Sequence, residues 1–159
     1  MKVTAAGTKR VSMAALICTR SDHRPRLIYR IHLDRGPAKG RRKGFTEADY
    51  ARLLDAAHQQ LGGPIVLVWD NLNTHVSRTM RRLIDARLWL TVYQLPSYAP
   101  EFNPVEGVWS HSKRSLANLT KHSLDQLTAL EKTRLKRMQY RPGLLDGLIA
   151  KTGLEFQPP

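Results

Sequence analysis

Two acidic residues occupy positions from which their side chains could share a metal ion. Asp70 directly follows the apolar run from Ile65 to Trp69, and Glu106 follows Asn103-Pro104, a pair typical of the start of a helix. Magnesium prefers oxygen ligands and is commonly held by a few carboxylates together with water. In phosphodiester chemistry, two such ions about 4 Å apart activate the attacking hydroxyl and stabilise the leaving oxygen. The two acids are therefore a candidate site for metal-dependent chemistry on a phosphodiester.

Both acids also have ordinary structural roles. An aspartate at the end of a strand is common in turns. Glu106 stands three residues after Asn103, so it could complete a capping box and complement the helix dipole. Residue type and spacing alone leave the metal site and these structural roles open.

The elements that must position the acids follow from hydrophobic periodicity and from capping signals. Two β-rich segments form a predicted hairpin before a basic loop, and the remaining segments alternate between helices and strands. The continuous apolar run before Asp70 is typical of a strand that is covered on both faces. The predicted elements are strands at 9–19 and 26–33, a helix at 46–61, strands at 65–69 and 89–95, a short helix capped by Ser77, and helices starting at Asn103, Ser123 and Leu144. This order predicts a single α/β domain with a mixed sheet over residues 1–159 and a helical C-terminal segment at 123–150.

The charge of the chain favours a polyanionic partner. Lys and Arg number 26 against 13 Asp and Glu, which gives a net charge of +13. No apolar run approaches the length of a membrane span, so nucleic acid is preferred to a membrane surface, with an inert basic surface as the alternative. The loop 34–44 concentrates this charge in Arg35, Lys39, Arg41, Arg42 and Lys43, and it is interpreted as either a DNA-phosphate contact or a solvated loop.

The cysteine content and the N-terminus point to a reducing compartment. Cys18 is the only cysteine, which excludes an internal disulfide framework and a zinc site built from cysteines. Its neighbours predict a buried thiol on a strand. No export signal is recognisable at the N-terminus, so we expect a cytoplasmic protein, associated with the nucleoid if the cell is bacterial.

Two sequence motifs resemble the catalytic core of DDE transposases, most closely the bacterial insertion-sequence branch (six-thirty type) of the mariner superfamily. The first is WDNLNTH, and the second is LPSYAPEFNPVEGVWSHSKR. The resemblance is strongest from Pro64 to Arg114, and the flanks from Val11 to Leu154 are compatible with it. The matching positions are Asp70, Asn71, His75, Leu95, Pro96, Tyr98, Pro100, Asn103, Pro104, Glu106, Trp109 and Lys113.

The resemblance implies a ribonuclease H-like fold and DNA cleavage and strand transfer with Mg²⁺ or Mn²⁺. Asp70 and Glu106 would be the second and third metal-binding acids, and transposon ends and target DNA would be the substrates. Trp109 is interpreted as a core residue rather than as a platform for base stacking. Residues expected to line the site or contact DNA are Asn71, His75, Asn103, Lys113 and Arg114, together with Arg41, Arg42 and Lys43 of the basic loop.

The sequence departs from the family pattern at its start. In the family, a first acid lies on the first, central strand, but no Asp or Glu precedes Asp22 here, and Asp22 and Asp34 are not on a leading strand. We therefore expect the first central strand to be missing and a two-metal site to require an upstream transposase segment; a homo-oligomer is the alternative partner. The chain would then be a split-gene product, a remnant or a truncated gene model. The competing functional predictions are a catalytically inactive, basic DNA-binding remnant and a different ribonuclease H-like nuclease.

Overall fold

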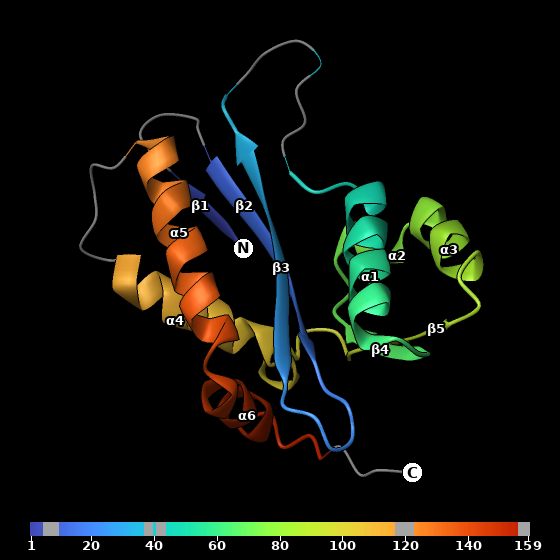
Figure 1. Cartoon of the computed structure of the whole chain (residues 1–159). Helices are drawn as coiled ribbons and strands as arrows, with labels where there is room; N and C mark the ends of the chain where they lie inside the picture. Colours follow the sequence, from blue (N-terminus) through green and yellow to red (C-terminus); the bar gives the residue numbers. More distant parts are fainter. Residues whose placement is uncertain (5–9, 37–39, 41–43, 117–122, 156–159) are drawn as a thin grey trace.

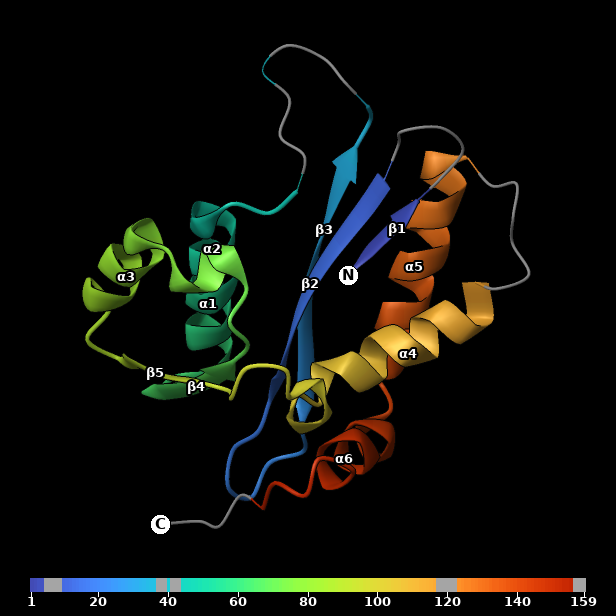
Figure 2. The ribbon, with the colours of Figure 1, turned by 180° about the vertical axis from the view of Figure 1, so that it is seen from behind.

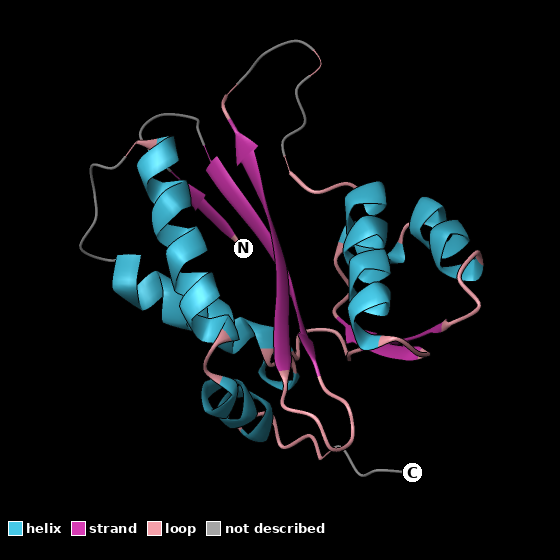
Figure 3. Ribbon diagram, in the orientation of Figure 1, coloured by secondary structure: helices cyan, strands magenta, loops and turns pink. Residues whose placement is uncertain are grey.

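The computed structural model describes the chain except for residues 5–9, 37–39, 41–43, 117–122 and 156–159. Its helices and strands alternate in the α/β order that the sequence predicts (Figure 3). No helix among the described residues is long and apolar enough to cross a lipid bilayer.

An antiparallel sheet forms from the first part of the chain (Figure 1). Strand β2 (Arg10–Cys18) pairs with β3 (Arg26–Asp34) along its whole length, from Arg10 opposite Asp34 to Cys18 opposite Arg26. These two strands confirm the predicted hairpin. The short strand β1 (Lys2–Thr4), which the sequence did not predict, pairs with the other edge of β2. Burial on β2 raises the pKa of Cys18 to about 11, as expected for an unreactive strand thiol.

A second, parallel sheet carries Asp70. Helix α1 (Glu47–Leu61) begins with a complete Thr46 capping box and ends at Gly62, whose φ of 67° is favourable only for glycine. Strand β4 (Ile65–Trp69) follows and pairs in parallel with β5 (Leu90–Gln94). Between the two strands lie α2 (Asn73–Val76) and α3 (Arg78–Asp85), and the Ser77 side chain caps α3 as predicted.

The C-terminal half is helical and covers one face of the antiparallel sheet (Figure 2). A short 3₁₀ turn η1 (Pro100–Phe102) leads into α4 (Val105–Leu116), which is followed by α5 (Leu124–Gln139) and α6 (Pro142–Ala150). Helix α1 packs against the opposite face of the same sheet through Leu53 and Ala57. The antiparallel sheet is therefore the middle layer of three.

The described strands form two separate sheets, whereas the sequence predicts one mixed sheet. The sheet orders are β1-β2-β3 and β4-β5, and no backbone pairing joins β1 to β4 among the described residues. Parallel and antiparallel pairings are both present, as a mixed sheet requires, but they are not connected. The face of the parallel sheet that carries Val66, Val68 and Tyr93 is also exposed, which is unusual because parallel strands are normally covered on both faces.

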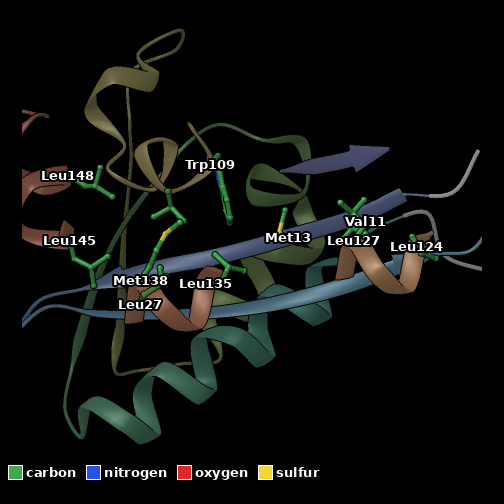
Figure 4. Packing of buried hydrophobic residues seen from close by; sticks show 11 residues of the cluster. Val11, Met13, Leu27, Trp109, Leu124, Leu127, Leu135, Met138, Leu145 and Leu148 are labelled. Carbon is green, nitrogen blue, oxygen red and sulfur yellow. The ribbon is translucent and has the colours of Figure 1, made fainter. Parts of the chain in front are cut away.

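Two hydrophobic clusters anchor the segments that carry the two acids. The larger cluster packs Trp109 and Val108 of α4 against Met13 and Leu27 of the antiparallel sheet, together with residues of α5 and α6 (Figure 4). The smaller cluster includes Trp69 of β4. Burial of each large apolar side chain contributes about 1.5–3 kcal/mol. Glu106 adjoins the first cluster and Asp70 follows the second, so each acid has its own packed support.

Candidate active site

Asp70 lies at the carboxyl end of β4, where open α/β sheets commonly place their sites. One of its oxygens, Oδ1, accepts hydrogen bonds from Nδ1 of His75 at 2.8 Å and from the backbone amide of Leu72 at 3.2 Å. The hydrogen bond from His75 is the main reason that the pKa of Asp70 lies below its ordinary value, and partial burial opposes this effect. The side chain is half exposed. Asp70 is therefore an oriented carboxylate that solvent or a ligand can reach.

An aromatic cage fixes the ring of His75. The imidazole stacks on the indole of Trp69 with 4.1 Å between ring centroids and 2° between ring planes, and Tyr50 of α1 meets it edge-on at 4.7 Å. Because a carboxylate can only accept, Nδ1 of His75 is the donor in its hydrogen bond to Asp70. For the second oxygen of Asp70, Oδ2, no hydrogen bond to another described residue is found.

Glu106 lies in the first turn of α4. The Oδ1 atom of Asn103 accepts the amide of Val105 at 3.1 Å, so Asn103 caps the helix as the sequence predicts. The capping box considered for Glu106 does not form, because the Asn103 amide donates instead to the carbonyl of Pro100 at 3.0 Å. The carboxylate of Glu106 is therefore not used to cap its own helix.

The charges of both acids act on the same amino group. The N-terminal amine of Met1 donates to the carbonyl of Met13 at 2.7 Å, and burial is the main cause that lowers its pKa. The negative charges of Glu106 and Asp70 oppose this shift, and the positive charge of Lys113 adds to it. Electrostatic effects of this kind between partly exposed groups fall off over about 10 Å. Asp70, Glu106 and Lys113 are therefore all within electrostatic range of the start of β1.

The other predicted site residues divide into three groups. Asn71 joins the site to the next loop, because its Nδ2 atom donates to the carbonyl of Leu95 at 2.8 Å. Lys113 and Arg114 are exposed in the last turns of α4, where both could reach a phosphate. Arg41, Arg42 and Lys43 lie outside the described residues, so their predicted contact with DNA stays a prediction.

The donor set suits a divalent cation in part. Asp70 and Glu106 offer carboxylate oxygens, which is the chemistry that Mg²⁺ and Mn²⁺ prefer. Among the residues that the structure describes, however, no group of three or more His, Cys, Asp or Glu side chains could together hold a metal ion. A magnesium ion held by these two carboxylates would therefore take its further ligands from water, phosphate or another segment.

Comparison with known proteins assigns this chain to a family. Residues 41–130, more than half of the chain and including both Asp70 and Glu106, match the model of the DDE superfamily endonucleases. The chain belongs to this family. A search of curated proteins found no match to this DDE superfamily member.

Solved structures show the same fold at low sequence identity. The Mos1 transposase catalytic domain solved with raltegravir and Mn has a TM-score of 0.55 at 15% identity, over 92% of this chain and 84% of that chain. The same domain with Mg gives 0.53 at 14%, over 92% and 85%. A Mos1 paired-end complex with the left transposon end gives 0.50 at 13%, over 92% and 56%. The predicted ribonuclease H-like fold of the DDE chain is thereby confirmed.

Several structural features of the site were not evident in the sequence. The cage around His75 needs Tyr50, which comes from a helix remote in sequence, and the approach of Met1 to the acids needs the unpredicted strand β1. Trp69 had a usable signal, because it directly precedes Asp70. A stacked partner for His75 could have been suspected from that position, but the ring geometry could not.

Proposed function

We propose that this chain is the catalytic core of a DNA transposase of the bacterial insertion-sequence type, which cuts and joins DNA strands with the help of divalent metal ions. The observation that carries the proposal is the match of residues 41–130 to the DDE superfamily endonucleases, which includes both Asp70 and Glu106. Family membership makes DNA phosphodiesters the expected substrate class. The net charge of +13 suits such a polyanion.

In this proposal the two acids would hold Mg²⁺ or Mn²⁺, and the surrounding residues prepare them. Bound divalent ions would activate the attacking hydroxyl and stabilise the leaving oxygen. His75 binds Oδ1 of Asp70, which would leave Oδ2 available to a cation. Asn71 fixes the loop that leads to Glu106 through its bond to Leu95. Lys113 supplies a positive charge on the face of α4 that carries Glu106, where a DNA phosphate would approach.

The third acid of the site would come from a segment that adds to β1. Neither β1 nor β4 has a second described neighbour in its sheet, so each has an unpaired edge. The amino group of Met1, at the start of β1, is close enough to Glu106 and Asp70 for their negative charges to oppose the lowering of its pKa by burial. A strand joined ahead of Met1, or supplied by another polypeptide or a second copy, would enter the region between the two sheets and could place a carboxylate beside them.

The test is a cleavage and strand-transfer assay on transposon-end DNA with Mg²⁺ or Mn²⁺. The chain is assayed alone and with the upstream transposase segment, either fused to it or added separately. We expect little activity alone and restored activity with the segment. Asp70→Asn and Glu106→Gln should each abolish the restored activity, because each removes a metal-binding charge. Full activity in either variant would refute the site.

Matched controls separate the role of the site from a general loss of charge. Asp85→Asn at the end of α3 and Glu101→Gln in the η1 turn remove exposed acids close in sequence to the site residues. Both should leave the activity unchanged. Equal losses in the control and site variants would mean that the assay reports net charge rather than metal binding.

A second candidate function is DNA binding without catalysis. The absence of a three-ligand metal group among the described residues favours it. A chain of this kind would bind DNA but stay inactive even with the upstream segment, and would inhibit a complete transposase by competing for DNA ends.

A further inference from the structure

The loop between β5 and α4 carries an aromatic ring, that of Tyr98, that is not packed against the described part of the chain. Tyr98 is fully exposed, with a relative accessibility of 100%. Its φ of 59° lies in the left-handed region, which a bulky side chain rarely adopts because Cβ approaches the following carbonyl. The left-handed backbone conformation costs folding free energy, and residues strained in this way cluster at functional sites. The strained backbone and the exposed ring of Tyr98 together indicate that this side chain binds a ligand.

The loop around Tyr98 is firmly held at both ends. At its start, the amide of Leu95 donates to the carbonyl of Trp69 at 2.8 Å, and Asn71 donates to the carbonyl of Leu95 at the same distance. At its end, Asn103 is fixed by its bonds to Pro100 and Val105. Prolines at positions 96, 100 and 104 restrict the backbone further. A ligand of Tyr98 would therefore bind a presented ring without a large ordering cost.

The position of the loop connects Tyr98 with the candidate active site. The loop starts beside Asp70, through its bonds to Asn71 and Trp69, and it ends at the turn that leads to Glu106. Two further large apolar side chains are exposed in the same surroundings, Leu72 at 49% and Phe102 at 40%. An exposed ring on a loop that leads from Asp70 toward Glu106 suits a ligand with a flat apolar face that reaches the candidate site.

We propose that Tyr98 stacks on an unpaired base of the DNA substrate and so holds that nucleotide beside Asp70 and Glu106. The proposal rests on the proposed function, which supplies DNA as the substrate. A base has the required flat face, and phosphates further along the same strand would meet the positive charge of Lys113 and Arg114 in the last turn of α4. Bases inside a duplex are covered by their neighbours, so the base must lie at an unpaired end or outside the stack.

The test compares two DNA substrates in EDTA, where no cleavage occurs. One is a blunt duplex, and the other is the same duplex with a short single-stranded 3′ extension. We expect the wild-type chain to bind the extended DNA more tightly. Tyr98→Ala should weaken binding to the extended DNA about 5- to 150-fold, the range expected for the loss of one base–aromatic stack, and leave binding to the blunt duplex within twofold. Tyr98→Phe should bind like the wild type, because it keeps the ring.

Two further variants control for folding and for a general effect of exposed tyrosines. Tyr98→Gly should raise the melting temperature, because glycine accepts the positive φ, and yet lose the preference for extended DNA. Tyr140→Ala removes another largely exposed tyrosine, which lies at the end of α5 and away from the site. It should leave both affinities unchanged.

A direct readout is photo-crosslinking from 5-iodouracil placed in the single-stranded extension. We expect the crosslinked peptide to carry the modification at Tyr98. Equal binding of the extended DNA by Tyr98→Ala and the wild type would overturn the proposal but leave the proposed function standing. The proposal would also be overturned if Tyr98→Ala sedimented as a smaller species than the wild type while both bound DNA equally. Tyr98 would then contact a second copy of the chain instead of a base. A wild-type chain that binds neither DNA would overturn the proposed function itself.

Discussion

His75 donates a hydrogen bond through Nδ1 to Oδ1 of Asp70 at 2.8 Å, and the same imidazole lies flat against Trp69. The stack fixes the plane of the imidazole, and the hydrogen bond transmits that orientation to the carboxylate. This relationship gives His75 a positioning role toward Asp70. The sequence alone predicts only that His75 lines the site.

Removing the imidazole should raise the pKa of Asp70. In His75→Ala the main cause of the lowered value is lost, whereas His75→Asn keeps a donor near the same place. A carboxyl carbon NMR titration would measure both variants, and a normal pKa is expected only for His75→Ala. An unchanged pKa in His75→Ala would show that the hydrogen bond does not set the titration of Asp70.

The same substitution should change how stability depends on pH. Because the folded-state pKa of Asp70 is depressed, its stabilising effect is fully present above the unfolded pKa of about 4 and is lost as the pH falls through the folded-state pKa. The melting temperature of the wild type should therefore fall more steeply below pH 4 than that of His75→Ala. Parallel curves in acid for the two proteins would contradict this reasoning.

An ion pair remote from the site should also lose its stabilising effect as the pH falls. Arg87 contacts Asp55 of α1 through two bonds, from Nε to Oδ1 at 2.7 Å and from Nη2 to Oδ2 at 2.8 Å, and the hydrogen bond lowers the pKa of Asp55. Asp55→Asn should cost roughly 1 kcal/mol at pH 7, since the pair is partly exposed. Chemical denaturation should show this deficit shrinking as the pH falls below 4. A deficit that stays constant down to pH 2 would exclude a charge effect.

A side chain at Gly107 would force Leu148 to move, because α4 packs closely on α6 at this point. A Cβ atom there would lie 2.5 Å from Cδ2 and 3.3 Å from Cγ of Leu148. Alanine gains about 1 kcal/mol of helix propensity, but overpacking typically costs about 1–3 kcal/mol, so we expect Gly107→Ala to be destabilising in urea titrations. Gly147→Ala in α6 meets no atom within 4 Å and should be stabilising.

A double-mutant cycle tests the cause of the Gly107 effect. If the clash with Leu148 is responsible, Gly107→Ala combined with Leu148→Ala should be more stable than the sum of the two single changes predicts. Strict additivity would place the strain elsewhere. Because Gly107 adjoins Glu106, a shift of α4 that relieves the clash should also reduce any cleavage measured in the transposon-end assay proposed above.

The local elements were predictable because their signals are short-range. The Thr46 capping box, the Gly62 helix end, the Ser77 cap and the apolar run before Asp70 each depend on neighbouring residues, and all appear where the sequence indicates. Trp109 is buried, as predicted for a core residue.

The features that were missed depend on contacts between remote segments. Strand β1 has only three residues and is defined by its pairing with β2. The described strands form two sheets because β1 and β4 do not pair with each other, and no local pattern predicts this. The positive φ of Tyr98 is a property of the closed loop, which no local pattern around that residue indicates. Residue types therefore identified the acids, whereas tertiary packing determines how each acid is held.

Iron-mediated backbone cleavage tests the central claim most directly, that Asp70 and Glu106 bind one metal site. Fe²⁺ replaces Mg²⁺ in the folded chain, and ascorbate with peroxide then generates radicals that cut the backbone near the bound ion. We expect cuts beside both residue 70 and residue 106 that excess Mg²⁺ suppresses, and that disappear in Asp70→Asn and Glu106→Gln but persist in Asp85→Asn and Glu101→Gln. Cuts at only one of the two positions, or cuts that survive loss of either acid, would contradict a shared metal site.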